Sequence, residues 1–407
     1  MDRRKFLKFG AAGAAAATTG ACADSSNADR EAESAAESAP APRRGAKELS
    51  MVTTWPKNFP GLGDMATRTA DLIGRLTEGS VTVKVFAAGE LVPPFESFDA
   101  VSTGAADMYH GAEYYWQGKA KGFPFFAAVP MGLTADEMLG WIKYGGGQEL
   151  WDGLSAQFNI KPFPAGNTGQ QMGGWFKREI KTLEDFRGLN MRIPGLGGDV
   201  LRRLGGAAVA IPGGEIFQSL QSGAIDATEW VGPWNDLAFG FYRVAPFYYG
   251  PGFHEPGPML SCGMNLDVWN SLTAHEQLAV STACDWATNQ SIAEYQHQNA
   301  LALNTLVNDH KVQLRSFSDD IWREIQRVSA EVISEIGQSD ATTKAIYESY
   351  IAARGRAMRW SSVSDGPYLR ARTLGTEYER KPAETPRQPA SPAQNAPGNE
   401  PPADNEQ

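Results

Sequence analysis

Alternating apolar and polar residues mark short strands along this chain, and longer segments between them have a helical period. Residues 49–53 and 81–87 alternate as half-buried strands do. Between them, 64–76 has the period of a helix, with Asp64 as the expected N-cap and Gly79 as the stop. Strand and helix recur in this way with short connections. The pattern predicts an α/β fold with a mainly parallel sheet.

Two segments resemble one another internally: VSTGAADMYHGAEYYW at 101–116 and LQSGAIDATEWVGPWN at 220–235. Each has the pattern of a helix end, a glycine and a strand that ends in aromatic and polar residues. In open α/β sheets, ligands bind beyond the carboxyl ends of strands. The repeat therefore predicts two related lobes whose strand ends face one cleft, although two segments this short also match by chance. The identical pairs include Gly104–Gly223, Ala105–Ala224 and Asp107–Asp226.

The last third of the chain has a helical pattern. Thr273 and Glu276 form a capping box, and the run from there to about His310 lacks glycine and proline. Such a helix would be ~55 Å long at 1.5 Å per residue, more than one compact lobe needs. We expect it to brace both lobes or to lie in a subunit contact. Further helices are predicted at 318–336 and 341–360.

Residues 1–23 have the pattern of a twin-arginine export signal, with Arg3-Arg4 ahead of a mild Ala/Gly run. The run is too short and too weakly apolar to span a bilayer. Two processing routes remain open, cleavage after Ala23 and lipidation of Cys22, so the exported protein is either free in the periplasm or lipid-anchored. Residues 24–46 predict a flexible linker.

Composition indicates a globular protein and argues against a nucleic-acid partner. The chain has 407 residues, of which 42% are hydrophobic, and this length suits two domains or one bilobed body. The net charge is −10, without a basic patch interleaved with aromatics. Residues 382–407 are proline-rich and predict a disordered tail. Cys262 and Cys284 are expected to be buried free thiols, although spacing alone does not decide their pairing.

The strand LNMRIPG at 189–195 suggests a site for a small organic anion. Arg192 lies just before a glycine turn, and a helix is expected to begin near Asp199. A helix N-terminus offers free N–H groups, and a guanidinium pairs with carboxylates through two parallel hydrogen bonds. Glu229 follows a second apolar strand, where an unpaired carboxylate is costly. It therefore needs a nearby cation or donor, unless it lies at the solvent edge.

Familiar catalytic motifs are absent from the sequence. There is no zinc-type His/Cys spacing, G-x-S-x-G elbow, Walker loop or CxxC pair, and the glycines after Arg192 do not match a dinucleotide loop. His254, beside Glu255 in a loop rich in glycine and proline, is the one histidine in a site-like setting. It would be the titratable base of an alternative hypothesis, an exported metal-dependent enzyme acting on a small organic acid.

Four segments together resemble the solute receptors of tripartite ATP-independent periplasmic (TRAP) transporters, in particular their 2-oxoacid-binding branch. They are TWPKNFPGLG, GNTGQQMGGWF, GLNMRIPGLGG and IDATEWVGPWND, within a similarity from Leu49 to Arg372. The resemblance implies a binding protein, not an enzyme. It would have a two-lobed periplasmic-binding-protein-like α/β fold with hinge strands and a long bracing helix, and would deliver its ligand to TRAP membrane subunits. The expected parts are lobe I at 47–165 plus 234–270, lobe II at 166–233 plus 271–360, and a C-terminal helix at 361–381 in a homodimer contact.

The resemblance also implies which residues form the site. Arg192 matches the arginine that pairs with the substrate carboxylate in this family. A bridging cation, Na⁺ or Ca²⁺, would be held by Gln171, Glu229 and the carbonyl of Trp230, and oxygen ligands suit both ions. Gln170 is adjacent and of the same type as Gln171. The ligand is expected to be a 2-oxoacid such as pyruvate, contacted by Arg192, Gln171, Trp230, Asn167, Trp55, Asn58, Tyr114 and Tyr115.

Overall fold

The computed structural model describes residues 46–375. The predicted export signal, the linker up to residue 45 and the proline-rich tail lie outside these described residues. Within 46–375, no helix has both the length and the apolar character needed to cross a bilayer.

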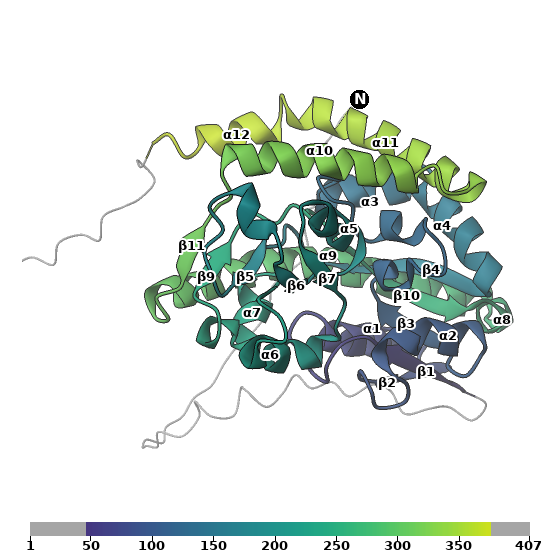
Figure 1. Ribbon diagram of the computed structural model, residues 1–407. Helices are drawn as coiled ribbons and strands as arrows, with labels where there is room; N and C mark the ends of the chain where they lie inside the picture. The colour runs from purple at the N-terminus through teal and green to yellow at the C-terminus, as the bar shows by residue number, and fades with distance from the viewer. Residues whose placement is uncertain (1–45, 376–407) are drawn as a thin grey trace, which may run out of the picture.

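Two separate sheets form the two lobes, side by side in Figure 1. The first has the order β2-β1-β3-β10-β4, and the second β11-β9-β5-β8-β6-β7. Parallel pairs such as β1–β2 and β6–β7 are combined with antiparallel pairs such as β10–β4 and β5–β9. The predicted two-lobed α/β fold is confirmed. The strands are β1 (Lys47–Thr53), β2 (Val81–Phe86), β3 (Met108–Gly111), β4 (Ile160–Asn167), β5 (Gly174–Phe176), β6 (Asn190–Arg192), β7 (Ala207–Val209), β8 (Ala227–Thr228), β9 (Phe247–Tyr249), β10 (Met259–Asn265) and β11 (Gln313–Arg315).

Helices cover both sheets, and α9 extends across both lobes (Figure 1), where it packs on β4, α1 and α7. The α-helices are α1 (Gly63–Leu76), α2 (Ser97–Ser102), α3 (Ala135–Tyr144), α4 (Gly147–Ser155), α5 (Gly195–Arg203), α6 (Gly213–Ser222), α7 (Pro233–Phe239), α8 (Leu266–Ser271), α9 (Ala274–Asn308), α10 (Asp319–Ile336), α11 (Ala341–Ser361) and α12 (Asp365–Ala371). Short 3₁₀ turns are η1 (Pro94–Glu96), η2 (Glu113–Trp116), η3 (Phe123–Phe126), η4 (Ala156–Phe158), η5 (Leu183–Phe186) and η6 (Phe241–Arg243).

Local capping signals predicted the C-terminal helices well. The capping box of Thr273 and Glu276 opens α9, whose 35 residues extend roughly 52 Å. Two N-terminal helix starts differ from the prediction. α1 begins at Gly63 without a side-chain cap, so Asp64 lies in its first turn, and α5 begins at Gly195 instead of Asp199. In α5 the expected glycine turn is itself helical.

The predicted internal repeat exists as two copies of one local arrangement. In each, a helix is followed by a glycine with positive φ, +80° at Gly104 and +83° at Gly223, where a side chain would be strained. The aspartate that follows then accepts a hydrogen bond from a backbone N–H of the neighbouring parallel strand, at 2.7 Å for Asp107 and 3.0 Å for Asp226. The shared role of these residues argues against a chance match.

Strand pairing gives lobe boundaries that differ from the sequence-based ones. β9 pairs with β5 and β11 in the second sheet, whereas 234–270 was expected, from the family resemblance, in the first lobe. α11 packs on α3 and α4 beside the first sheet, whereas 271–360 was expected in the second lobe. Crossings between lobes have no periodic signature, so the sequence pattern does not locate them.

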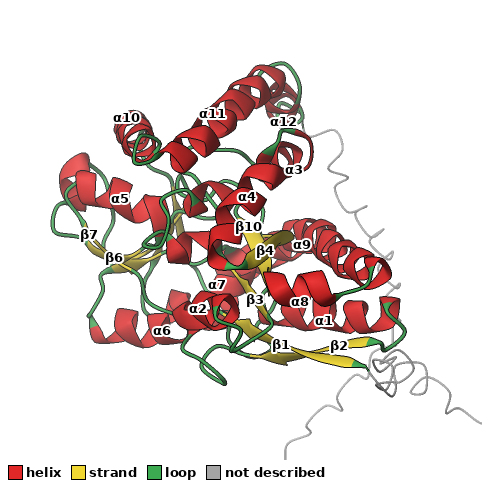
Figure 2. Ribbon diagram, turned by 90° about the vertical axis from the view of Figure 1, so that its right-hand side faces the viewer, coloured by secondary structure: helices red, strands yellow, loops and turns green. Residues whose placement is uncertain are grey.

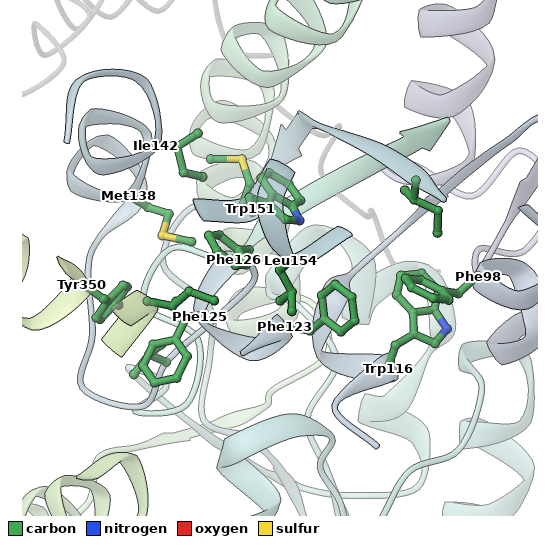
Figure 3. Packing of buried hydrophobic residues seen from close by; sticks show 14 of the residues in the cluster. Phe98, Trp116, Phe123, Phe125, Phe126, Met138, Ile142, Trp151, Leu154 and Tyr350 are labelled. Carbon is green, nitrogen blue, oxygen red and sulfur yellow. The ribbon is translucent and has the colours of Figure 1, made fainter. Parts of the chain in front are cut away.

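The first lobe has an aromatic core that fixes the position of α11. Phe126 stacks on Trp151 and Trp141, with ring centroids 5.3 Å and 5.4 Å apart. Figure 3 shows Phe126 beside Trp151, with Tyr350 of α11 reaching the same cluster. The Tyr350 hydroxyl also accepts a hydrogen bond from the backbone N–H of Leu133 at 2.9 Å. This core holds α11 over the first lobe, with α12 beyond its end (Figure 2).

Cys262 of β10 and Cys284 of α9 are both buried and free. The prediction of two buried thiols is confirmed.

Candidate functional site

Two crossing segments between the lobes run side by side. Residues 168–173 lead from β4 to β5, and 250–258 lead from β9 to β10. The N–H of Gln171 donates to the carbonyl of Glu255 at 3.2 Å, and the N–H of Gly252 donates to the carbonyl of Gln171 at 2.8 Å. These hydrogen bonds hold the side chains of both crossings at the ends of β6 and β8.

Arg192 and Glu229 form a buried ion pair where β6 and β8 end. Nη1 of Arg192 donates to the Glu229 carboxylate and, at 3.4 Å, to the Glu229 carbonyl. Both side chains are only 1% exposed. Burial alone would lower the pKa of Arg192, but the surrounding acidic groups, Glu229 foremost among them, together outweigh burial and the pKa is raised. Glu229 therefore has the buried cation that its position in the sequence required.

His254 and Glu255 complete a cluster with Glu229. Nε2 of His254 lies 3.1 Å from Oε2 of Glu229. The three residues offer ligand atoms that all lie within 4.8 Å of one another. Burial raises the pKa of Glu255 well above its ordinary value, and the Glu229 charge raises it further. Two carboxyl groups thus share one guanidinium, which leaves the cluster short of positive charge.

Several buried polar atoms of this cluster have no hydrogen-bond partner within the described residues. Such atoms are rare in folded proteins because each one forfeits its hydration. Donors and acceptors both occur here, which suits a ligand with an anionic group and a cation bound beside it. The atoms are Nη2 of Arg192, Oε1 of Gln171, Nε1 of Trp230, Nδ1 of His254 and Oε2 of Glu255.

The first lobe contributes aromatic side chains to the same place. Tyr114 packs against the start of α5, so that a Cβ at Gly195 would lie 3.1 Å from the Tyr114 Cβ. Burial raises the pKa of the Tyr115 phenol, and the nearby charge of Arg192 offsets part of this increase. Trp55 meets Trp230 edge to face with centroids 6.4 Å apart. The guanidinium of Arg192 lies over the other tryptophan, Trp230, at 5.1 Å.

Some residues suggested by the sequence lie outside this cluster. Asn58 is exposed, in a surface hollow with Lys57 and Glu90. Asn167 is buried but bonds backbone groups: its Nδ2 donates to the Gly257 carbonyl at 3.2 Å, and its Oδ1 accepts from the Gly169 N–H at 2.8 Å. These bonds make Asn167 a support for the crossing segments.

The choice between the two adjacent glutamines follows from their surroundings. Gln170 is exposed, and its amide donates to the carbonyls of Gln171 and Gly252. Gln171 is buried, and its Nε2 donates to Thr168 Oγ1 at 3.0 Å, while its Oε1 has no hydrogen-bond partner within the described residues. The buried oxygen fits a cation ligand, and the exposed Gln170 does not.

Sequence reasoning missed Glu255 as a member of the site and singled out His254 only as a base. The signal was weak: two ionisable residues in a loop of glycines and prolines, far from Glu229 in sequence. Only the return of the chain from β9 to β10 brings them to the end of β8.

Residues 51–340 match the DctP model, described as bacterial extracellular solute-binding protein, family 7. The chain is 41% identical over 321 residues to a monocarboxylate 2-oxoacid-binding periplasmic protein of Nostoc sp. (strain PCC 7120), covering 78% of this chain and 87% of that protein.

Solved structures show the same fold. One is a TRAP periplasmic solute-binding protein from Pseudoalteromonas atlantica T6c with bound sodium and pyruvate. It is 36% identical, with a TM-score of 0.78 over 80% of this chain and 99% of that one. Another, from Bordetella bronchiseptica RB50, is a mixed-occupancy dimer with copurified calcium and picolinate. It is 33% identical, with a TM-score of 0.79 over 81% of this chain and 98% of that one.

The extent of these matches decides between receptor and enzyme. They cover both lobes and the segments that hold Arg192, Glu229 and Glu255. The chain therefore belongs to family 7 of the bacterial extracellular solute-binding proteins, the periplasmic substrate receptors of TRAP transporters, which are not enzymes.

Proposed function

We propose that this protein captures a small 2-oxoacid such as pyruvate, together with a bridging cation, and delivers it to TRAP membrane subunits. The observation that carries the proposal is the group of buried polar atoms without partners around Arg192 and Glu229. Nη2 of Arg192 is a charge-assisted donor for a carboxylate. The free oxygens beside it suit a cation that the 2-oxo group and the carboxylate can share.

The donor set fits a hard cation. Gln171 Oε1 and the Glu229 and Glu255 carboxylates are oxygen ligands, and we add the Trp230 carbonyl from the family resemblance. When bound, the cation would supply positive charge between the acidic side chains and the ligand. Counting Arg192, the two glutamates and a monocarboxylate, the ionised site is doubly negative. Ca²⁺ would neutralise it and Na⁺ would do so by half, so we expect Ca²⁺ to support tighter binding.

The aromatic side chains of the first lobe close the site. Trp55, Tyr114 and Tyr115 lie against elements of the second lobe, and Trp230 faces them. Closing the lobes on a ligand would exclude water and strengthen each charged contact. A receptor of this design needs no base, and His254 is engaged with Glu229.

A homodimer through α11 and α12 is part of the proposal. A groove of about 1060 Å³ runs between α3, α9, α11 and α12. Its rim presents Tyr144, Trp360 and Tyr368, exposed by 94%, 68% and 65%. An apolar surface of this kind marks a protein contact. Light scattering should give twice the monomer mass, and Trp360→Asp should give the monomer; a monomeric wild type would contradict the dimer.

Export through the twin-arginine route is proposed from the sequence alone, because residues 1–23 lie outside the described structure. Changing Arg3 and Arg4 to lysine should retain the precursor in the cytoplasm. Mass spectrometry of the exported protein should then distinguish cleavage after Ala23 from lipidation of Cys22.

Native mass spectrometry of the exported protein tests the function directly. We expect a bound mass equal to a small 2-oxoacid plus Ca²⁺ or Na⁺, lost in Arg192→Ala. A copurified sugar or amine without a metal would contradict the proposal.

A further inference from the structure

His110 lies in the middle of the first sheet and reaches the proposed site through Trp55. It belongs to β3, is fully buried, and uses both ring nitrogens. The indole N–H of Trp55 donates to Nδ1 at 2.8 Å, and Nε2 lies 3.1 Å from the carbonyl of Ala165 in β4. Because an indole nitrogen can only donate, Nδ1 must be unprotonated. Nε2 then holds the ring hydrogen and donates to Ala165.

This arrangement fixes the tautomer and orientation of the imidazole. Two strands of one sheet hold it: β3 carries the residue, and β4, on the far side of β10, supplies the Ala165 carbonyl. Burial lowers the pKa of His110 to about 4, so the ring is neutral at neutral pH and remains an acceptor. The acceptor offered to Trp55 is therefore rigid.

The Trp55 side chain has one polar atom, the indole nitrogen Nε1, and its hydrogen is donated to His110. The hydrogen bond consequently sets the rotation of the indole, whose ring meets Trp230 at 6.4 Å and Tyr115 at 6.4 Å. Trp230 lies under the Arg192 guanidinium. Trp55 is thus connected to the anion-binding arginine through Trp230, and the rotation of its indole limits the space beside Trp230.

We propose that His110 is a positioning residue that fixes Trp55 as a wall of the cleft and thereby sets the length of 2-oxoacid that the closed protein accepts. This inference rests on the proposed function. Without the acceptor, the buried indole N–H has no partner, and the ring gains by rotating toward one. Rotation of the Trp55 indole would deprive short ligands of a packing contact and make room for longer ones.

Three single variants, and the double variant that combines His110→Leu with Trp55→Phe, separate this role from a purely structural one. His110→Leu removes the acceptor, whereas His110→Asn keeps an oxygen near the Nδ1 position. Trp55→Phe keeps a ring without the donor. Their affinities for pyruvate and for 2-oxooctanoate are measured by calorimetry on the exported chain with Ca²⁺, and thermal melts check folding.

We expect His110→Leu to weaken pyruvate binding about tenfold, the effect of one unsatisfied buried hydrogen bond. The affinity for 2-oxooctanoate should fall less than that for pyruvate, so the ratio of the two affinities changes. Trp55→Phe should show the same change in ratio, His110→Asn should remain within about threefold of wild type, and the double variant should be no worse than His110→Leu, since both changes break one bond.

An unchanged affinity ratio in His110→Leu, or additive losses in the double variant, would overturn the inference while the proposed function stands. If His110→Leu does not fold, an unchanged ratio in Trp55→Phe overturns it equally. A wild type that binds neither acid overturns the proposed function, and this inference with it.

Discussion

The guanidinium of Arg192 donates to both the carboxylate and the backbone carbonyl of Glu229, yet its Nη2 has no partner within the described residues. Sequence reasoning assigned Arg192 to the ligand alone. The structure gives it two roles, because the same side chain compensates a buried carboxylate and keeps a donor for an anion. A buried charge that loses its partner is strongly destabilised, so Arg192 and Glu229 are expected to act as a unit.

Replacing Arg192 with alanine should abolish useful binding. It removes the ligand donor and leaves Glu229 uncompensated, a loss of about 2–5 kcal/mol for a truncated buried charge pair. Calorimetry with pyruvate and Ca²⁺ measures it. The matched control is Arg202→Ala, an exposed arginine of α5 that pairs with Asp199. Equal affinity in the Arg192 and Arg202 variants would remove the anchor from the account.

Glu255 should determine which cation the protein prefers. With a cation bound and Glu255 ionised, Glu255→Gln removes one negative charge from the cluster while keeping an oxygen, so pyruvate binding supported by Ca²⁺ should weaken more than binding supported by Na⁺. We expect roughly a tenfold change in the Ca²⁺/Na⁺ affinity ratio, about 1.4 kcal/mol. Calorimetry in each salt measures the ratio, and Glu215→Gln on the surface of α6 is the control. Parallel losses with both ions would contradict the charge argument.

Much of the fold was predictable because its signals are local. The capping box at Thr273 and Glu276 joins groups three residues apart, and the positive-φ glycine of each repeat copy follows the helix that it ends. Arg192 and Glu229 were also singled out from the sequence, since both lie at strand ends in an apolar setting where charge needs a partner, and the structure pairs them.

The placements that sequence reasoning missed depend on contacts between residues that are far apart in the chain. Glu255 reaches the cluster through a crossing between lobes, and His110 acts through Trp55, 55 residues away. Asn58 was expected in the site from family resemblance but lies in an exposed turn. No pattern of period or composition encodes these placements. Which residues meet there is decided by sheet order.

Asn235 should stabilise the closed arrangement of the lobes. From α7 of the second lobe, its Nδ2 donates to the Pro60 carbonyl of the first lobe at 2.8 Å, and its Oδ1 accepts from Tyr295 of α9 at 2.8 Å. Asn235→Ala removes both bonds and should weaken ligand binding by about 1–3 kcal/mol. Small-angle scattering should show a larger radius of gyration for the ligand-free variant.

Tyr295→Phe, which removes one of the two bonds, should fall between the wild type and Asn235→Ala. Asn289→Ala, on the exposed face of α9, is the control. An Asn235→Ala protein with unchanged affinity and dimensions would show that this bridge does not hold the lobes together.

Glu113 should make the protein less stable as the pH rises. Burial raises the pKa of its carboxyl to about 7 from an ordinary 4.5, while the Tyr109 hydroxyl donates to it at 2.7 Å. Between these values the unfolded chain releases the proton and the folded chain keeps it. The stabilisation is therefore complete below pH 4.5 and is lost as the pH rises through 7.

Glu113→Gln removes this dependence. Relative to wild type it should gain on the order of 3 kcal/mol at pH 8 and nothing comparable at pH 4.5. Urea unfolding at both pH values measures the difference. Asp236, whose pKa burial also raises to about 7, leaves the Glu113→Gln variant a residual slope in the same direction. A gain independent of pH would mean that the carboxyl does not titrate in this range.

The central claim is that one guanidinium and one captured cation together hold a small acid between the lobes. Titration calorimetry of pyruvate into chelator-treated protein, with and without added Ca²⁺ or Na⁺, tests it most directly. We predict tight binding with Ca²⁺, weaker binding with Na⁺, and at least a hundredfold loss, about 2.7 kcal/mol, in a buffer with neither ion. Equal affinity in that buffer would contradict the claim.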